Sequence, residues 1–219
     1  MNIKGIIFDL DGTLIDSMEV WSRTDMAFLK ECGVKDPPPD VSDEVKKMTV
    51  DDSAMYFINR FGLKLSKEYV IDRIEELVRI QYEEKIPLKP YVPQLLDRLD
   101  EKGIPYGVAT ATYKRLAEAV LKRCGIYERF RFVLTDEEYP LGKTCPDIFL
   151  GAAARLGTEI SETLVVEDSL HCCETAKKAG FILCGVYDSV SACDRAQIEK
   201  SRIIILSHLQ SFVRCCDKW

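Results

Sequence analysis

The chain has 219 residues, and its 30 lysines and arginines against 36 aspartates and glutamates give a formal net charge of −6. Hydrophobic residues make up 47% of the sequence, which is enough to form a packed core and excludes a disordered chain. The acidic balance argues against a broad nucleic-acid-binding surface, which needs clustered basic residues. A membrane span is not expected either, because no run of about 18 apolar residues is present.

The first residues form a short apolar run that ends at Asp9 and Asp11. This segment is too short and too acidic for a secretory signal, so we expect a cytoplasmic protein. The sequence contains nine cysteines but no C-x-x-C pair. This usage predicts reduced, mostly buried thiols rather than a zinc or dithiol site.

In chain order, a predicted strand over residues 3–8 is followed by a long helical segment. Between residues 17 and 85 the sequence shows helical patterns without a strand, over 18–32, 43–47, 51–61 and 66–84. A segment of about 70 residues is too long for an ordinary crossover connection, so we interpret it as a separate helical subdomain. We therefore predict an α/β core made of residues 1–16 and 87–219, and a helical cap over residues 17–86.

The remaining predicted elements alternate between strands and helices. Short apolar runs predict strands over 105–109, 132–134, 164–166, 182–186 and 203–206. Helical patterns over 92–102, 113–124, 146–156 and 170–179 are each followed by glycine, which is a common residue just after a helix. Strands of this kind are typical of a parallel sheet buried on both faces. The alternation predicts a doubly wound, Rossmann-like α/β fold.

Acidic residues follow two of the predicted strands. Asp9 and Asp11 are two residues apart at the end of the first strand, so their side chains should leave on the same side. Glu167 and Asp168 follow the strand over 164–166. Ligands of open parallel sheets lie beyond the carboxyl ends of the strands, where these carboxylates should converge. Converging carboxylates favour a hard divalent cation, and we expect Mg²⁺.

Two further polar groups are expected at the same crevice. Thr110 follows the strand over 105–109, and Lys143 precedes the helix over 146–156. A cation, a lysine and a hydroxyl together suit a phosphoryl group. A carboxylate beside a metal can attack phosphorus, and a second carboxylate can transfer protons to and from the oxygens involved.

The segment DLDGTLIDS, residues 9–17, resembles the first motif of the haloacid dehalogenase superfamily. Thr110, Lys143 and Glu167-Asp168 resemble its second, third and fourth motifs, in the same order and at strand ends. The helical insert is similar to the cap of the subfamily that holds β-phosphoglucomutase and phosphoglycolate phosphatase. The resemblance covers essentially the whole chain and implies a doubly wound core with a helical cap.

The resemblance also implies a role for each motif residue. Asp9 would be the nucleophile and Asp11 the general acid and base. Thr110 would bind the phosphoryl group, and Lys143 would neutralise its charge. Mg²⁺ would be held by Asp9, the backbone carbonyl of Asp11, Glu167 and Asp168.

Substrate identity is expected to depend on the cap and on the start of the loop after Thr110. We expect Asp16, Lys46, Lys47 and Ala111 to contact the substrate, since polar cap residues suit a sugar-like metabolite. The expected function is a magnesium-dependent phosphatase that hydrolyses a small phosphate monoester through an aspartyl-phosphate on Asp9. The expected partner is a small phosphorylated metabolite, with neither nucleic acid nor membrane, and the chain is expected to be a monomer or a weak dimer.

The sequence also bears on several alternatives to a phosphatase. The β-phosphoglucomutases that the chain resembles carry a histidine at the position of Trp21 and an arginine at the position of Val50. Both differences favour a phosphatase, so a phosphosugar mutase is the second candidate. Dehalogenases lack the second acid, and the related phosphonate hydrolases have a small residue in place of Asp11. A receiver-like phospho-acceptor would be shorter, lack the helical insert, and carry its acceptor on a middle strand.

Overall fold

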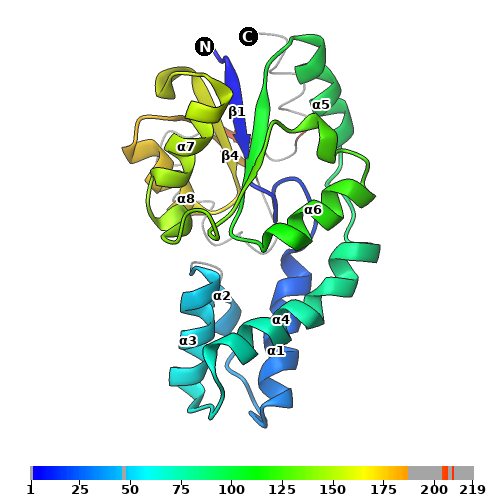
Figure 1. The fold of residues 1–219 in the computed structure, drawn as a ribbon, viewed down its shortest axis with the longest axis vertical. Helices are drawn as coiled ribbons and strands as arrows, with labels where there is room; N and C mark the ends of the chain where they lie inside the picture. The colour runs from blue at the N-terminus through cyan, green and yellow to red at the C-terminus, as the bar shows by residue number, and fades with distance from the viewer. Residues whose placement is uncertain (1, 46–47, 187–203, 207–208, 210–219) are drawn as a thin grey trace.

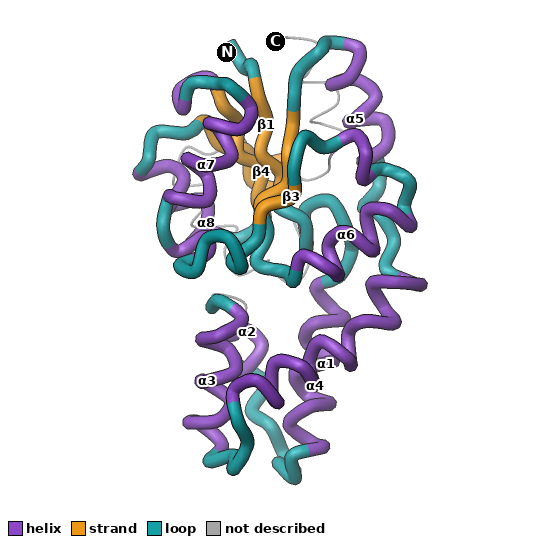
Figure 2. The backbone as a smooth tube through the Cα atoms, in the orientation of Figure 1, coloured by secondary structure: helices purple, strands orange, loops and turns teal. Residues whose placement is uncertain are grey.

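The computed structural model describes residues 2–45, 48–186, 204–206 and 209. Its centre is a parallel sheet with the strand order β3-β2-β1-β4-β5-β6, flanked by helices (Figures 1 and 2). The strands are β1 (Gly5–Phe8), β2 (Tyr106–Ala109), β3 (Val133–Leu134), β4 (Thr163–Glu167), β5 (Ile182–Val186) and β6 (Ile204–Leu206). The predicted doubly wound sheet is therefore confirmed, and each predicted strand lies within two residues of its observed bounds.

Strand β1 lies inside the sheet, with neighbours on both sides. Phe8, its last residue, is in register with Val108 of β2 and with Val166 of β4. All four residues of β1 are buried, which explains why its sequence is continuously apolar rather than alternating. The carboxyl ends of β1, β2 and β4 consequently lie along one edge of the sheet.

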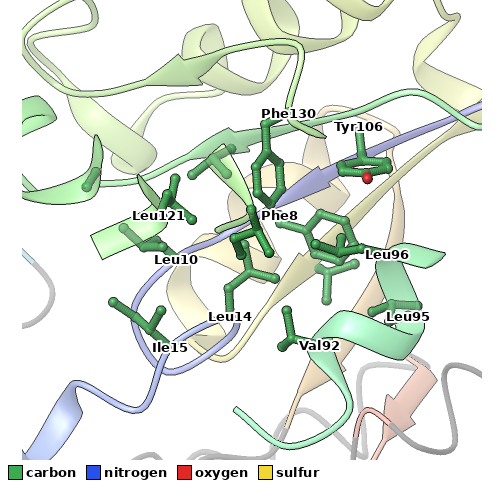
Figure 3. Packing of buried hydrophobic residues seen from close by; sticks show 14 of the residues in the cluster. Phe8, Leu10, Leu14, Ile15, Val92, Leu95, Leu96, Tyr106, Leu121 and Phe130 are labelled. Atoms are coloured by element: carbon green, nitrogen blue, oxygen red, sulfur yellow. The ribbon is translucent and has the colours of Figure 1, made fainter. Parts of the chain in front are cut away.

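Helices cover both faces of this sheet. Alternate residues of β1 enter different cores: Ile6 and Phe8 pack with α5 (Val92–Glu101) and α6 (Lys114–Arg123), and Ile7 packs with α7 (Asp147–Leu156) and α8 (Leu170–Lys178). Figure 3 shows the first of these cores, where Phe8 lies among leucine, valine and aromatic side chains. Burial of such side chains stabilises the folded state by about 25 cal/mol per Å² of apolar surface removed from water, and it occurs on both faces of the sheet.

The segment between β1 and α5 is helical. It contains α1 (Met18–Glu31), α2 (Val41–Val45), α3 (Val50–Phe61) and α4 (Lys67–Ile80), and it forms its own apolar core around Phe28 and Phe57. Figure 1 shows these helices beyond the end of the core domain. The helix predicted over 66–84 is shorter than expected, since α4 passes into a π-helical turn, η1 (Gln81–Lys85).

The two chain segments that join the helical part to the sheet lie side by side. Ile15 pairs with Leu88 in an antiparallel bridge, and the backbone N–H of residue 16 donates to the Pro87 carbonyl at 3.0 Å. This geometry suits a hinge, and the division into a core (1–16 and 87–219) and a cap (17–86) remains our prediction.

Two expectations about the rest of the chain can be compared with the structure. The six described cysteines are free thiols, of which three are buried and three partly buried, so the expectation of mostly buried thiols is met by half of those described. No helix in the described part of the chain is both long and apolar enough to cross a membrane.

Candidate active site

The candidate site lies where the strand order reverses, between β1 and β4. Asp9 follows β1, and its backbone N–H donates to Val166 of β4 at 2.9 Å. Glu167 is the last residue of β4, and Asp168 follows it. Ligand sites of doubly wound sheets lie at this reversal point, so the fold places all three carboxylates where a ligand is expected.

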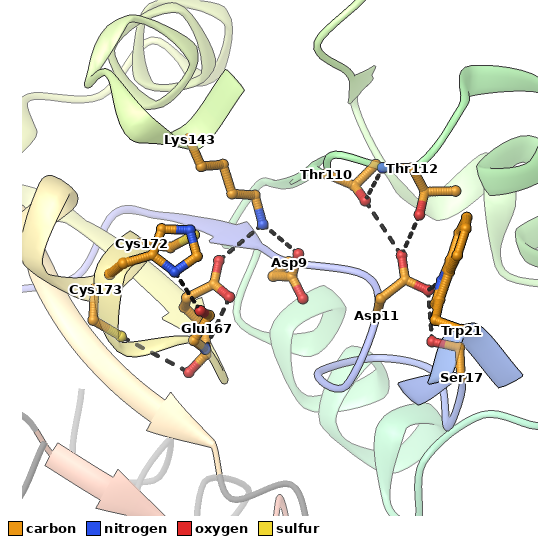
Figure 4. A network of polar contacts seen from close by, with 12 residues as sticks. Asp9, Asp11, Ser17, Trp21, Thr110, Thr112, Lys143, Glu167, Cys172 and Cys173 are labelled. Atoms are coloured by element: carbon orange, nitrogen blue, oxygen red, sulfur yellow. Dashed lines mark hydrogen bonds and ion pairs between the residues drawn. The ribbon is translucent and has the colours of Figure 1, made fainter. Parts of the chain in front are cut away.

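Lys143 joins two of these carboxylates. Its ammonium forms an ion pair with Asp9 and another, at 2.8 Å, with Glu167; Figure 4 shows the lysine between them. All three side chains are at most 7% exposed. Burial disfavours the charged lysine, but the two carboxylates outweigh it and hold the pKa of Lys143 well above its ordinary value. The lysine therefore stays protonated.

Asp9, Glu167 and Asp168 together fit a divalent cation. One oxygen from each lies within 4.8 Å of the others, and all three residues are buried. When all three carboxylates are ionised, they and the Lys143 ammonium carry a net charge of −2. Burial together with Glu167 raises the pKa of Asp9 despite Lys143, so a cation at this place would favour the ionised carboxylate. The second oxygen of Asp9, Oδ2, is buried without a hydrogen-bond partner in the described structure. Oxygen ligands and this excess charge match the requirements of Mg²⁺.

Gly12 allows one of these carboxylates to approach the turn after β1. Its φ is +82°, a conformation that glycine adopts readily. A Cβ atom at this position would lie 2.5 Å from Oδ2 of Asp168. A side chain at residue 12 would therefore collide with the Asp168 carboxylate.

The Asp11 side chain faces a different set of partners. Ser17 and Thr112 each donate to it at 2.5 Å, and the indole N–H of Trp21 lies 3.3 Å from it. The Tyr82 hydroxyl also donates to Asp11 and accepts from the Trp21 N–H at 2.6 Å. As Figure 4 shows, this carboxylate points away from Lys143 and toward the first helix of the cap.

Thr110 lies directly after β2, as predicted, and beside Asp11. It is 1% exposed, its hydroxyl accepts from the Thr112 backbone N–H at 3.0 Å, and it lies 3.5 Å from Asp11. The neighbouring residue Ala111 lines the cavity beside the acids. The structure therefore brings Asp9, Asp11, Thr110 and Lys143 to one place; their catalytic roles stay predictions.

The predicted substrate contact by Asp16 is not supported by its position. Asp16 is exposed and does not line the cavity formed by the described residues. The chain runs extended here beside Leu88, so successive side chains alternate: Ile15 and Ser17 face inward and are buried, and Asp16 faces outward. Lys46 and Lys47 lie outside the described residues.

A cavity of about 420 Å³ lies between the acidic residues Asp9, Glu167 and Asp168 and the helical segment over residues 18–85. Its core side carries Asp9, Lys143 and Glu167, whereas much of its cap side is apolar and includes Trp21, Val50 and other residues such as Met48, Phe57 and Ile74. A volume in this range suits a small-molecule ligand. The polar end would receive a charged group, and the cap would contact the rest of the ligand.

Comparison with known proteins identifies the family. A family model described as "Haloacid dehalogenase-like hydrolase" matches residues 6–186. The chain belongs to this haloacid dehalogenase-like hydrolase family. The resemblance of residues 9–17 to the family's first motif is thus confirmed, and so is the prediction that the protein is a hydrolytic enzyme.

Individual relatives of this hydrolase include named phosphatases. The chain is 30% identical over 183 residues to N-acetylmuramic acid 6-phosphate phosphatase of Pseudomonas aeruginosa, covering 82% of this chain and 80% of that protein. It is 28% identical over 173 residues to hexitol phosphatase B of Escherichia coli, covering 77% of each. The crystal structure of β-phosphoglucomutase from Clostridium difficile shares the fold, with a TM-score of 0.80, 18% identity and coverage of 99% and 98%.

Sequence reasoning missed several neighbours of Asp11 in this hydrolase. Tyr82 is 71 residues away along the chain and Thr112 is 101 residues away, so no local spacing could have connected them with Asp11. Tyr82 is fully buried, and burial together with Asp11 raises the pKa of its hydroxyl well above the ordinary value. The hydroxyl therefore keeps its proton and acts as a donor to Asp11.

Proposed function

We propose that this hydrolase is a magnesium-dependent phosphatase of a small phosphate monoester, a sugar phosphate or a similar metabolite. The observation that carries this proposal is the state of the Asp9 carboxylate. One oxygen is paired with Lys143, whereas Oδ2 is buried and has no protein partner among the described residues. A carboxylate held in this way is oriented for attack on phosphorus while keeping one oxygen available.

Asp9, Glu167 and Asp168 would hold the magnesium ion, with the backbone carbonyl of Asp11 as a further ligand. When bound, the ion supplies positive charge that neutralises the carboxylates and polarises the phosphoryl oxygens. Lys143 adds a second positive charge at the same place and keeps Asp9 directed into the cavity. Both charges favour binding of a phosphate dianion beside three acidic residues.

In the first proposed step, an Asp9 oxygen attacks phosphorus and forms an aspartyl-phosphate. The bond between phosphorus and the ester oxygen breaks, and Asp11 donates a proton to that leaving oxygen. Thr110 and Lys143 would contact the transferred phosphoryl group. In the second step water attacks phosphorus, Asp11 takes the proton from water, and Asp9 and inorganic phosphate are released.

Asp11 must turn for this chemistry, because its carboxylate faces Ser17 and Thr112 instead of Lys143. Two of its partners, Trp21 and Tyr82, belong to the helical segment over residues 18–85. Movement of this segment would therefore change the hydrogen bonds that hold Asp11. We propose that substrate binding and closure of the cap release Asp11 toward the leaving oxygen.

A phosphosugar mutase is the second candidate, since β-phosphoglucomutase shares the fold. Two features favour the phosphatase. Val50 lines the cavity, and no arginine does so in the described part of the chain, whereas a mutase must hold a second phosphate, for which arginine is well suited. The named phosphatases that the chain resembles act on phosphorylated sugar derivatives, an N-acetylmuramic acid phosphate and hexitol phosphates, to judge from their names.

The function can be tested by phosphorus NMR with a pool of sugar phosphates, including β-glucose 1-phosphate and a trace of glucose 1,6-bisphosphate. We expect inorganic phosphate to accumulate with Mg²⁺, and both EDTA and Asp9→Asn to stop it. Accumulation of glucose 6-phosphate without free phosphate would identify a mutase. Unchanged turnover in Asp9→Asn would exclude the covalent mechanism.

A further inference from the structure

The cap side of the cavity contains a buried carboxylate that the proposed mechanism does not use. Asp25 lies on α1 one turn after Trp21 and one turn before Phe28, so these three residues share one face of the helix. Trp21 contacts Asp11, and Phe28 belongs to the core of the cap. Asp25 lies between them, lines the cavity and is only 4% exposed.

Few groups in the structure offset the cost of removing the Asp25 carboxylate from water. The described residues give its carboxylate no ion pair, and Ser42 is the one side chain that lowers its pKa. Ser42 on α2 lies close enough to oppose the effect of burial, which nevertheless raises the pKa of Asp25 to about 7. The Ser42 hydroxyl is itself buried without a hydrogen-bond partner in the described structure and lines the same cavity. Buried polar groups normally have partners, so a ligand group could complete this pair.

The chemistry of the pair restricts what it could bind. A carboxylate accepts hydrogen bonds, and a serine hydroxyl can both donate and accept, so together they match neighbouring hydroxyl groups of a polyol. Lys143 and His171 are the basic residues among the described cavity-lining residues, and both belong to the core. A phosphate or carboxylate on the cap side would instead meet the acceptor oxygens of Asp25 in an apolar, weakly screened environment.

We propose that Asp25 and Ser42 form a subsite for hydroxyl groups at the end of the substrate distal to the phosphate. This inference rests on the proposed phosphatase function and narrows its substrate class to neutral polyol or sugar monophosphates. Substrates with a second phosphate or a carboxylate at that end are excluded by Asp25. The same exclusion disfavours the bisphosphate that a phosphosugar mutase needs.

Two compounds that differ at one carbon test the subsite. Glucitol 6-phosphate carries a hydroxymethyl group at the end where 6-phosphogluconate carries a carboxylate. Their dissociation constants are measured by calorimetry with Mg²⁺ at pH 8, where most of Asp25 is ionised, in an Asp9→Asn background that prevents turnover. We expect glucitol 6-phosphate to bind at least about tenfold more tightly, since a like charge at close range is strongly unfavourable. Adding Asp25→Asn should reduce this preference about tenfold. Adding Ser42→Ala should raise the dissociation constant of glucitol 6-phosphate roughly two- to tenfold.

A matched control separates direct contact from a general charge effect. Glu19 is an exposed acid on the same helix and does not line the cavity. Glu19→Gln removes one negative charge from this helix, as Asp25→Asn does, and should leave the preference for glucitol 6-phosphate unchanged. Equal affinities for the two compounds in the Asp9→Asn background, or a preference that Asp25→Asn leaves intact, would overturn the proposed subsite. Hydrolysis of p-nitrophenyl phosphate by the unmodified enzyme tests the phosphatase function separately, because this compound has neither a distal hydroxyl nor a second anion.

Discussion

Two aspartates at the cavity have opposite surroundings, and this difference suggests different roles. Asp11 accepts hydrogen bonds from side chains of both the core and the helical segment. Asp25 is more deeply buried and has only the weak influence of Ser42. A buried carboxylate without such donors reduces the stability of the folded protein, so its presence is best explained by a ligand.

The burial of Asp25 predicts a dependence of stability on pH. Its pKa rises from an ordinary value of 3.8 to about 7 in the folded protein, so the folded state binds the proton more tightly than the unfolded state. The free energy of unfolding should therefore fall as the pH rises from about 4 through 7. Asp25→Asn removes this dependence, so it should be more stabilising at pH 8 than at pH 5, by at most about 3 kcal/mol.

Urea unfolding of both proteins at pH 5 and pH 8 provides the measurement. The difference between the two proteins isolates Asp25, because other titrating groups contribute equally to both. Glu19→Gln is the control on the exposed side of α1 and should show the same difference at both pH values. A stability gain for Asp25→Asn that is equal at pH 5 and pH 8 would contradict the raised pKa.

Individual site residues could be predicted from the sequence where a local pattern marks them. Asp9 and Glu167 end apolar strands, and the structure brings both to Lys143. Asp25 also has a local signal, because it is an acidic residue on an otherwise apolar helix face, between Trp21 and Phe28. The partners of Asp11 have no such signal, because distant segments bring them together.

At the scale of elements, the π-helical turn η1 connects the helical segment over residues 18–85 to Asp11. It places Tyr82 with its ring 5.9 Å from the Trp21 ring, edge to face, and its hydroxyl on Asp11. Arg123 of α6 donates to the carbonyls of Tyr82, at 3.2 Å, and of Ile86. These bonds satisfy backbone groups at the end of the helix and fix Tyr82 next to the core.

This arrangement predicts a stability cost for removing the Tyr82 hydroxyl. Tyr82→Phe leaves the Trp21 N–H and Asp11, both partly buried, each with one hydrogen-bond partner fewer, so the free energy of unfolding should fall by about 1–3 kcal/mol. Tyr69→Phe is the matched control on α4, where the side chain is 53% exposed, and should change stability by less than about 0.5 kcal/mol. Urea unfolding measures both; equal effects would show that the hydroxyl of Tyr82 does not stabilise the site.

The elements themselves were largely predictable because their ends carry strong signals. Gly103, Gly125, Gly157 and Gly180 follow the four predicted core helices, and all have positive φ. The π-helical turn was not predictable, because residues 81–85 continue the helical pattern of α4 and the change to wider hydrogen bonding has no periodic signal. The prediction of an α-helix over 66–84 is therefore wrong for its last residues, which form a π-helical turn, although the chain remains helical there.

At the scale of the whole molecule, the sheet concentrates negative charge at one edge. Asp9, Glu167 and Asp168 share this edge because β1 and β4 are parallel neighbours. The alternation of strands and helices predicts such a sheet, and the family resemblance supplies the roles of its acids. What the sequence does not determine is how the cap meets the core, for example at Glu75 and Arg115, whose side chains form an ion pair at 2.5 Å.

The excess charge predicts that magnesium stabilises the folded protein. A ligand that binds only the folded state raises the free energy of unfolding, by about 2.7 kcal/mol at a free concentration 100 times its dissociation constant. Thermal unfolding should therefore shift upward with MgCl₂ and return after EDTA. Asp168→Asn should reduce the shift, and NaCl at equal ionic strength should not reproduce it. An identical shift in Asp168→Asn would place the ion elsewhere.

The most direct test of the mechanism is to trap the phosphorylated carboxylate. Enzyme is mixed with Mg²⁺ and a phosphate monoester that it hydrolyses, quenched within one turnover and treated with borohydride, which reduces an acyl phosphate to an alcohol. Peptide mass spectrometry then locates the reduced residue. We predict conversion of Asp9 to homoserine, and none in Asp9→Asn. Phosphate release with Asp9 unreduced, or reduction at another carboxylate, would contradict the proposed nucleophile.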